Sequence, residues 1–146
     1  MEKLKVAVLG AGEVGMEFVR AMDKHHYFEI VELYGNRSAG KKLEDVVVLS
    51  DGDLEQIRTL RIKPTEPMGS ISKNLDLICS ALPSDIARTI EGECARHTPV
   101  ISTASAYRYE DDVPIIITEI NPDHYRELCI IQLKIKVYNL ISRRKR

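Results

Sequence analysis

Three glycines near the amino terminus are spaced as in loops that bind phosphate. They follow the β-rich run of residues 5–9 in the pattern G-x-G-x-x-G. Glycines at such a turn let backbone N–H groups approach a pyrophosphate, and the helix that follows points its positive end at the charge. A merely tight strand-to-helix turn is the alternative, but the order of strand, loop and helix favours nucleotide binding. The loop contains Gly10, Gly12, Glu13, Val14 and Gly15.

The residues after the loop have the periodicity of a helix that packs on a sheet. Apolar side chains recur at three- and four-residue steps at Val14, Phe18, Val19 and Met22. Such a stripe predicts an amphipathic helix whose apolar face covers a sheet. A second β-rich run, residues 28–34, predicts the neighbouring parallel strand.

The loop after this second strand carries side chains that suit a phosphate. In a dinucleotide fold an acidic residue here favours NAD, whereas small polar and basic residues favour the 2′-phosphate of NADP. Glu32 lies too early in the strand for this role. The loop offers the guanidinium of Arg37, the hydroxyl of Ser38 and the ammonium groups of Lys41 and Lys42. We therefore predict NADP rather than NAD, with a basic solvated loop as the alternative.

Three more β-rich runs follow, at residues 60–63, 75–83 and 99–103. The first alternates in polarity and ends at a proline, which is typical of an edge strand. The second is mostly apolar, as a buried parallel strand is. The alternation of strands and helices predicts an α/β fold of the Rossmann type, with a doubly wound, mostly parallel sheet in a single domain.

A second helix is predicted between the last two of these strands. Ser84 is its expected N-cap, and the helix should continue to residue 97. Ile86, Ala87 and Ile90 have helical spacing and should face the sheet.

Ligands of open parallel sheets bind beyond the carboxyl ends of the strands. Residues 10–15, 36–41, 80–83 and 103–108 all follow predicted strand ends. We therefore expect these four segments to converge on one crevice.

Composition limits the partners and the compartment. The formal net charge is −1, so nothing global indicates nucleic acid or a membrane surface, and the basic residues 143–146 are interpreted as a solvated tail. The three cysteines lack metal-type spacing and indicate a reduced, cytoplasmic setting. His25 and His26 have no further ligand cluster, so no metal site is predicted. No apolar run resembles a signal peptide or a membrane span.

Four strings resemble one enzyme family. In chain order they read Asn-Arg-Ser-Ala-Gly-Lys-Lys, Ser-Ala-Leu-Pro-Ser-Asp, Ser-Ala-Tyr-Arg with Glu-Asp-Asp-Val-Pro, and Glu-Ile-Asn-Pro-Asp-His. Over residues 3–132 the chain is similar to the amino-terminal, NADP-binding domain of aspartate-semialdehyde dehydrogenases of the archaeal and fungal type. Malonyl-CoA reductases are similar over the same region, but Ser-Ala-Leu-Pro-Ser and Ser-Ala-Tyr-Arg favour the semialdehyde enzyme. We therefore expect a binding domain at residues 1–128 and a divergent basic tail at 129–146.

The resemblance implies an enzyme that reduces aspartyl phosphate to aspartate semialdehyde with NADPH, on the route to lysine, threonine and methionine. In that chemistry a cysteine thiolate attacks the acyl phosphate, and the thioester accepts hydride from the nicotinamide. By the same resemblance, the glycine loop would hold the pyrophosphate. The 2′-phosphate would be bound by Asn36, Arg37 and Ser38, and the cofactor would be lined by Ser80, Ala81, Leu82 and Ser105.

Arg108 lies in the string Ser-Ala-Tyr-Arg, and the resemblance implies that it binds the phosphate of the substrate. A planar fork of donors is suited to that task. From the residues alone, a surface ion pair with Asp111 or Asp112 is the alternative.

The chain departs from the family pattern in two places. The family loop Gly-Ala-Thr-Gly-x-Val-Gly has one residue more, and the shorter loop of this chain places the carboxylate of Glu13 where a phosphate is expected. The family's nucleophile string Asn-Pro-Asn-Cys-Ser is missing. Cys79, Cys94 and Cys129 are each predicted to be buried or incidental. No catalytic residue is therefore predicted, and we expect a truncated gene product.

Dehydrogenase activity should then be absent from the chain itself. The alternative function is a non-enzymatic, NADP-responsive binding or regulatory module. We also expect self-association through apolar sheet surface that the missing part of the family would cover.

Overall fold

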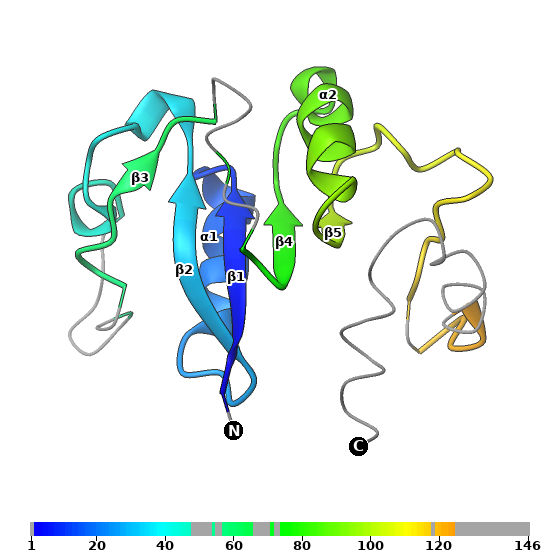
Figure 1. The fold of residues 1–146 in the computed structure, drawn as a ribbon, viewed down its shortest axis with the longest axis horizontal. Coiled ribbons are helices and arrows are strands. Elements are labelled where there is room, and N and C mark those ends of the chain that lie inside the picture. The colour runs from blue at the N-terminus through cyan, green and yellow to red at the C-terminus, as the bar shows by residue number, and fades with distance from the viewer. Residues whose placement is uncertain are drawn as a thin grey trace.

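The computed structural model describes residues 2–47, 54, 57–65, 71, 74–117 and 119–124. Within these ranges the chain forms a five-stranded parallel sheet with the strand order β3-β2-β1-β4-β5 (Figure 1). The strands are β1 (Leu4–Leu9), β2 (Phe28–Tyr34), β3 (Ile62–Lys63), β4 (Leu77–Ser80) and β5 (Val100–Ser102). The helices are α1 (Glu13–Met22) and α2 (Ser84–Ala95), with short 3-10 helices at Asn36–Ser38 and Leu43–Asp45.

The helices α1 and α2 cover opposite faces of the sheet. Side chains alternate along the central strand β1, so that Val6 and Val8 pack in the apolar cluster under α1, whereas Ala7 and Leu9 pack in the cluster under α2. All four are completely buried, as expected of a parallel strand covered on both faces. The prediction of a doubly wound, Rossmann-type α/β fold in a single domain is confirmed.

Helix α1 packs on the sheet through Val19, which is fully buried. Phe18 and Met22 are partly buried against the same cluster, as predicted. The prediction was wrong for Val14, whose side chain is 52% exposed. The first turn of the helix packs through the buried Gly15 against the backbone of Gly10. Successive residues of a helix are rotated by about 100°, so Val14 is turned away from this contact.

Helix α2 starts one residue earlier than predicted. Pro83 occupies the N-cap position and Ser84 is the first helical residue, so the prediction of Ser84 as the N-cap was wrong. Its hydroxyl lies 3.0 Å from the hydroxyl of Ser105 and accepts a hydrogen bond from the N–H of that residue (3.3 Å). The hydroxyl of Ser84 therefore binds the loop after β5 and does not cap the first turn of α2. The predicted apolar face is confirmed, since Ala87 and Ile90 are buried.

Strands β3, β4 and β5 lie within the predicted runs but are shorter than them. Strand β3 pairs with β2 at the edge of the sheet and ends before Pro64. Arg61, which was predicted within this strand, instead forms an isolated antiparallel bridge with Lys42. The chain after β2 thus folds back beside β3.

Among the described strands, β5 forms the other edge of the sheet, and Ile101 on it is 51% exposed. Self-association through this surface stays a prediction. The predicted tail at residues 129–146 lies outside the described residues. Among the helices that the structure describes, none has the length and apolar character needed to cross a membrane.

Gly15→Ala should destabilise the fold, because a Cβ at this position would overlap the carbonyl oxygen of Gly10. Overpacking costs about 1–3 kcal/mol, and the upper end applies here because the overlapping atom belongs to the backbone. We therefore expect the free energy of unfolding to fall by about 3 kcal/mol, as measured by urea unfolding followed by circular dichroism. Gly12→Ala is the matched control, because its Cβ would meet nothing within 4 Å, and alanine at this N-cap position should cost no more than about 1 kcal/mol. Equal stability of the two variants would contradict this packing of α1.

Candidate functional site

The carboxyl ends of the strands are tied together by backbone hydrogen bonds. The N–H of Gly10 donates to the last carbonyl of β2 (2.8 Å), that of Ala81 to the last carbonyl of β1 (2.7 Å), and that of Thr103 to the last carbonyl of β4 (3.0 Å). The arrowheads of β1, β2 and β4 point the same way in Figure 1. The predicted convergence of the segments that follow these strands is therefore observed.

Three glycines in these segments are required by packing within the protein. Gly10 has a φ of +102°, and a Cβ there would lie 2.7 Å from the carbonyl oxygen of Ala81. A Cβ on Gly15 would overlap the carbonyl oxygen of Gly10, and one on Gly35 would lie 2.7 Å from the Cβ of Ala11. The loops after β1, β2 and β4 are thus in close backbone contact.

Gly12 differs from these glycines, because a Cβ there would meet nothing within 4 Å. Its φ of −88° is ordinary for any residue. It is the N-cap of α1 and provides no side-chain hydrogen bond to the first turn, where Glu13 and Val14 are both exposed. The chain therefore leaves an open space at the positive end of α1, which is where an anion binds to a helix.

The loop after β2 presents nitrogen donors. Asn36 and Arg37 are exposed, and Ser38 is partly buried. The Oδ1 atom of Asn36 accepts hydrogen bonds from the N–H and the hydroxyl of Thr65, each at 2.8 Å. Arg37 forms no ion pair within the described part of the chain.

The acidic residue near the end of β2 is already engaged. The carboxylate of Glu32 forms an ion pair with the ammonium group of Lys63 (2.7 Å) and accepts a hydrogen bond from the hydroxyl of Tyr34. Its side chain is only 15% exposed. Glu32 therefore offers little to a ribose, in agreement with its place within the strand.

The segment after β4 is mostly enclosed. Ser80 is fully buried, and its hydroxyl has no hydrogen-bond partner among the described residues. Leu82 is 7% exposed and packs in the cluster under α2. Ala81 is partly exposed and lies against Gly10, so it is the member of this predicted group that faces the glycine loop.

The loop after β5 is fastened to α2 by Arg88. Its guanidinium donates to the carbonyl of Ala106 (2.7 Å) and forms an ion pair with Glu110 (2.6 Å). The hydrogen bond and charge of Glu110 raise the pKa of this guanidinium. Tyr107 in turn donates its hydroxyl to the carbonyl of Arg88, in the space that a Cβ on Gly92 would fill. These contacts hold the loop against α2.

The fastened loop leaves Arg108 exposed, and no ion pair of its guanidinium with a described residue is found. The alternative pairing with Asp111 or Asp112 is thus not observed. Ser105 is exposed at the start of the loop and is held by Ser84. Both predicted residues therefore stand near the carboxyl end of β5.

Sequence reasoning missed the two residues that hold these loops, Thr65 and Arg88. Each acts across more than twenty positions of the sequence, since Thr65 contacts a residue 29 positions away and Arg88 one 22 positions away. The residues next to Thr65 and Arg88 in the sequence form no motif from which these contacts could be predicted.

The two described cysteines are unsuited to nucleophilic catalysis. Burial raises the pKa of the Cys79 thiol to about 12. Burial, together with the nearby carboxylates of Glu91 and Glu93, raises the pKa of the Cys94 thiol to about 11. Both thiols are therefore neutral at physiological pH, in agreement with the prediction that they are buried small hydrophobes. Cys129 lies outside the described residues.

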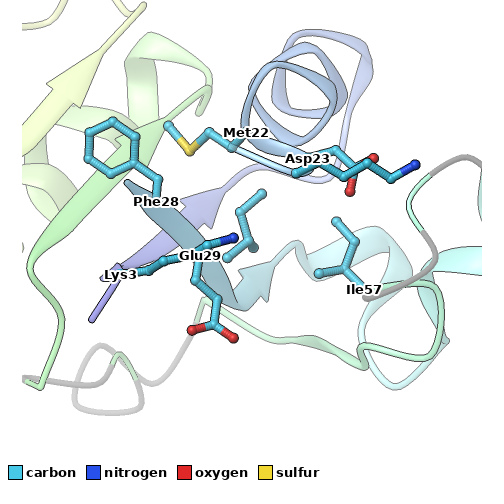
Figure 2. Close-up of a pocket in the computed structure, with 8 residues that line it drawn as sticks. Lys3, Met22, Asp23, Phe28, Glu29 and Ile57 are labelled. Atoms are coloured by element: carbon cyan, nitrogen blue, oxygen red, sulfur yellow. The ribbon is translucent and has the colours of Figure 1, made fainter. Parts of the chain in front are cut away.

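A small pocket lies at the opposite end of the sheet from the glycine loop (Figure 2). It is bordered by Lys3 before β1, by Phe28 and Glu29 at the start of β2, and by Met22 and Asp23 at the end of α1. Its volume is about 50 Å³, far below the roughly 300 Å³ of a small ligand site. In the described ranges, no group of three His, Cys, Asp or Glu side chains is arranged to hold a metal ion.

A family model described as "Semialdehyde dehydrogenase, NAD binding domain" matches residues 5–128. The chain belongs to this semialdehyde dehydrogenase family. It is 41% identical over 124 residues to the aspartate-semialdehyde dehydrogenase of Methanothermobacter thermautotrophicus, covering 82% of this chain and 35% of that protein. It is 37% identical over 123 residues to the malonyl CoA reductase (NADP) of Metallosphaera sedula, covering 82% and 34%.

The semialdehyde dehydrogenase fold is also found among solved structures. The aspartate semialdehyde dehydrogenase of Candida albicans, determined with NADP, superimposes with a TM-score of 0.76 at 30% identity, over 97% of this chain and 39% of that one. The chain thus spans little more than a third of the length of these relatives. The segments that converge at the strand ends belong to the nucleotide-binding domain of the semialdehyde dehydrogenase family.

The buried thiols of this semialdehyde dehydrogenase domain should resist labelling. In a Cys129→Ser chain at pH 8, neither Cys79 nor Cys94 should react with Ellman's reagent, because their raised pKa values leave almost no thiolate. Unfolding in urea should release both thiols, and the absorbance of the released thionitrobenzoate counts them. Rapid reaction of either thiol in the folded chain would contradict the assignment.

Proposed function

We propose that this chain is the NADP-binding domain of an aspartate-semialdehyde dehydrogenase and that residues 1–128 form this domain. The observation that carries the proposal is the open space at Gly12. Neither the φ of Gly12 nor its neighbours in the protein require a glycine at this position. A phosphate that approaches the first turn of α1 would require one, because a side chain would block it. The exposed N–H groups of that turn and the field of the helix suit the negative charge of a pyrophosphate.

The other contacts follow from the loops around Gly12. Asn36, Arg37 and Ser38 would bind the 2′-phosphate, because they stand exposed or partly exposed where β2 ends. Ala81, beside Gly10, would line the cofactor, together with Ser105 from the loop after β5. The residues that support this lining from within are Ser80 and Leu82.

The same geometry favours NADP over NAD. Where β2 ends, the carboxylate of Glu32 is paired with Lys63, whereas the guanidinium of Arg37 is exposed and unpaired within the described residues. A guanidinium recognises a phosphate monoester well and a ribose hydroxyl poorly. The relative from Candida albicans was determined with NADP, which is in line with this preference.

The whole enzyme would reduce aspartyl phosphate to aspartate semialdehyde, with bound NADPH supplying hydride. The relatives named aspartate-semialdehyde dehydrogenase support this proposal. Arg108 would bind the phosphate of the substrate, since it is exposed and uncommitted beyond β5. The positioning of its loop falls to Arg88 and Tyr107. The catalytic nucleophile would come from a segment that these 146 residues do not contain.

Calorimetric titration of the purified chain should show NADPH binding at least about tenfold tighter than NADH, the value of a charge-assisted hydrogen bond. Gly12→Ala should weaken the binding of both cofactors about tenfold or more, because its Cβ would fill the space needed by the pyrophosphate. Its loss of stability in urea unfolding should stay within about 1 kcal/mol, the cost of an alanine at the N-cap of α1. The proposal fails if neither cofactor binds, or if Gly12→Ala leaves binding unchanged.

The chain alone should not catalyse the NADP- and phosphate-dependent oxidation of aspartate semialdehyde, because Cys79 and Cys94 are buried and protonated. Formation of NADPH, followed by its absorbance, measures this reaction, and the Methanothermobacter enzyme is the positive control. Turnover by this chain that disappears in Cys129→Ser would contradict the expectation and make Cys129 the nucleophile.

A further inference from the structure

We infer that Thr65 is a positioning residue for cofactor selectivity, because it fixes the side chain of Asn36 with its two amide N–H donors available to the 2′-phosphate of NADP. The inference rests on the proposed function, since it assumes that the cofactor passes the end of β2. It adds a residue from beyond β3 to a site whose other members follow β1, β2, β4 and β5.

The orientation of the Asn36 amide is decided by the chemistry of its partner. The backbone N–H of Thr65 lies 2.8 Å from one amide atom of Asn36, and the hydroxyl of Thr65 lies 2.8 Å from the same atom. A backbone N–H can only donate, so the atom that it meets must be the amide oxygen. The nitrogen of Asn36, with both its hydrogens, therefore points away from Thr65.

Burial makes this orientation firm. Thr65 is fully buried, whereas Asn36 is exposed. A flipped amide would leave the buried N–H of Thr65 facing another donor, at the cost of an unsatisfied polar group. The amide oxygen is thus kept inside, and the side chain of Asn36 offers a ligand the two N–H donors of its amide.

The nearest carboxylates along the chain do not oppose these donors. Glu32 is paired with Lys63. Glu44 is paired with the ammonium group of Lys42 (3.2 Å), and Asp45 accepts a hydrogen bond from the N–H of Lys42 (3.2 Å). Donors without free acceptors suit a phosphate, whose oxygens only accept, better than a ribose hydroxyl, which also has a proton to donate.

Asn36→Asp tests the orientation with almost no change of shape. One carboxylate oxygen would still accept from Thr65, while the other would replace the outward donors with a negative acceptor, as in sites that select NAD. We expect NADPH binding to weaken about 10- to 100-fold and NADH binding to be kept or improved, so that the preference inverts. Calorimetric titration of the 146-residue chain with each cofactor measures both constants.

Thr65→Val tests the anchor itself, since it removes the hydroxyl and leaves the shape and the backbone N–H. The backbone N–H would still set the direction of the amide, but the amide would lose one of the two hydrogen bonds that hold it in place. The preference for NADPH over NADH should therefore fall about three- to tenfold, the value of one hydrogen bond. Thr65→Ser restores the hydroxyl and should restore the preference. Thr98→Val is the matched control, because Thr98 is also buried but precedes β5 at the opposite end of the sheet, and its preference should be unchanged.

The outcomes separate this inference from the proposed function. If the unaltered chain binds neither cofactor, the proposed function fails and the inference fails with it. If the chain binds NADPH selectively but the preference is the same in Thr65→Val and Thr65→Ser, or stays with NADPH in Asn36→Asp, only the inference is overturned. Loss of selectivity in Thr98→Val to the same extent would also overturn it, since the effect would then be one of general stability.

Discussion

The contact between the first turn of α1 and the end of β1 is the constraint on which the rest of the structure depends. Gly15 lies directly on the carbonyl oxygen of Gly10, and Gly10 lies against the backbone of Ala81. The start of the helix, the end of the central strand and the start of the segment after β4 are thereby held at one level. The position of the exposed amino terminus of α1 therefore depends on the absence of a Cβ at Gly10 and at Gly15.

The fold could be predicted where its signals are local. Strand β2 has the bounds of the predicted run, because a strand is recognised from the β-forming and apolar character of consecutive residues. Val14 and Ser84 were misassigned for a different reason. The buried side of α1 is chosen by the contact at Gly15, and the hydroxyl of Ser84 is claimed by Ser105, 21 positions away. Neither choice is visible in the periodicity of the helix itself.

The candidate site divides in the same way. The glycine loop and the strings after β2, β4 and β5 were found from motif and family resemblance, and the described residues place them at adjoining strand ends. The residues that fix the loops were not found. Whether Thr65 reaches Asn36 depends on the register of β3 against β2, and whether Arg88 reaches Glu110 depends on how the loop crosses α2. Contacts of this kind join residues far apart in the sequence, so they cannot be predicted from local sequence patterns.

Helix α2 carries a glycine in its interior, although glycine lowers helix propensity by about 1 kcal/mol relative to alanine. The hydroxyl of Tyr107 occupies the space beside Gly92 and reaches the helix backbone at Arg88. Replacement of Gly92 by alanine would raise the helix propensity of α2, but its Cβ would displace the hydroxyl of Tyr107. Gly92 and Tyr107 are therefore expected to change together in evolution or to be kept together. The lower helix propensity of α2 is then a consequence of binding the loop that contains Tyr107.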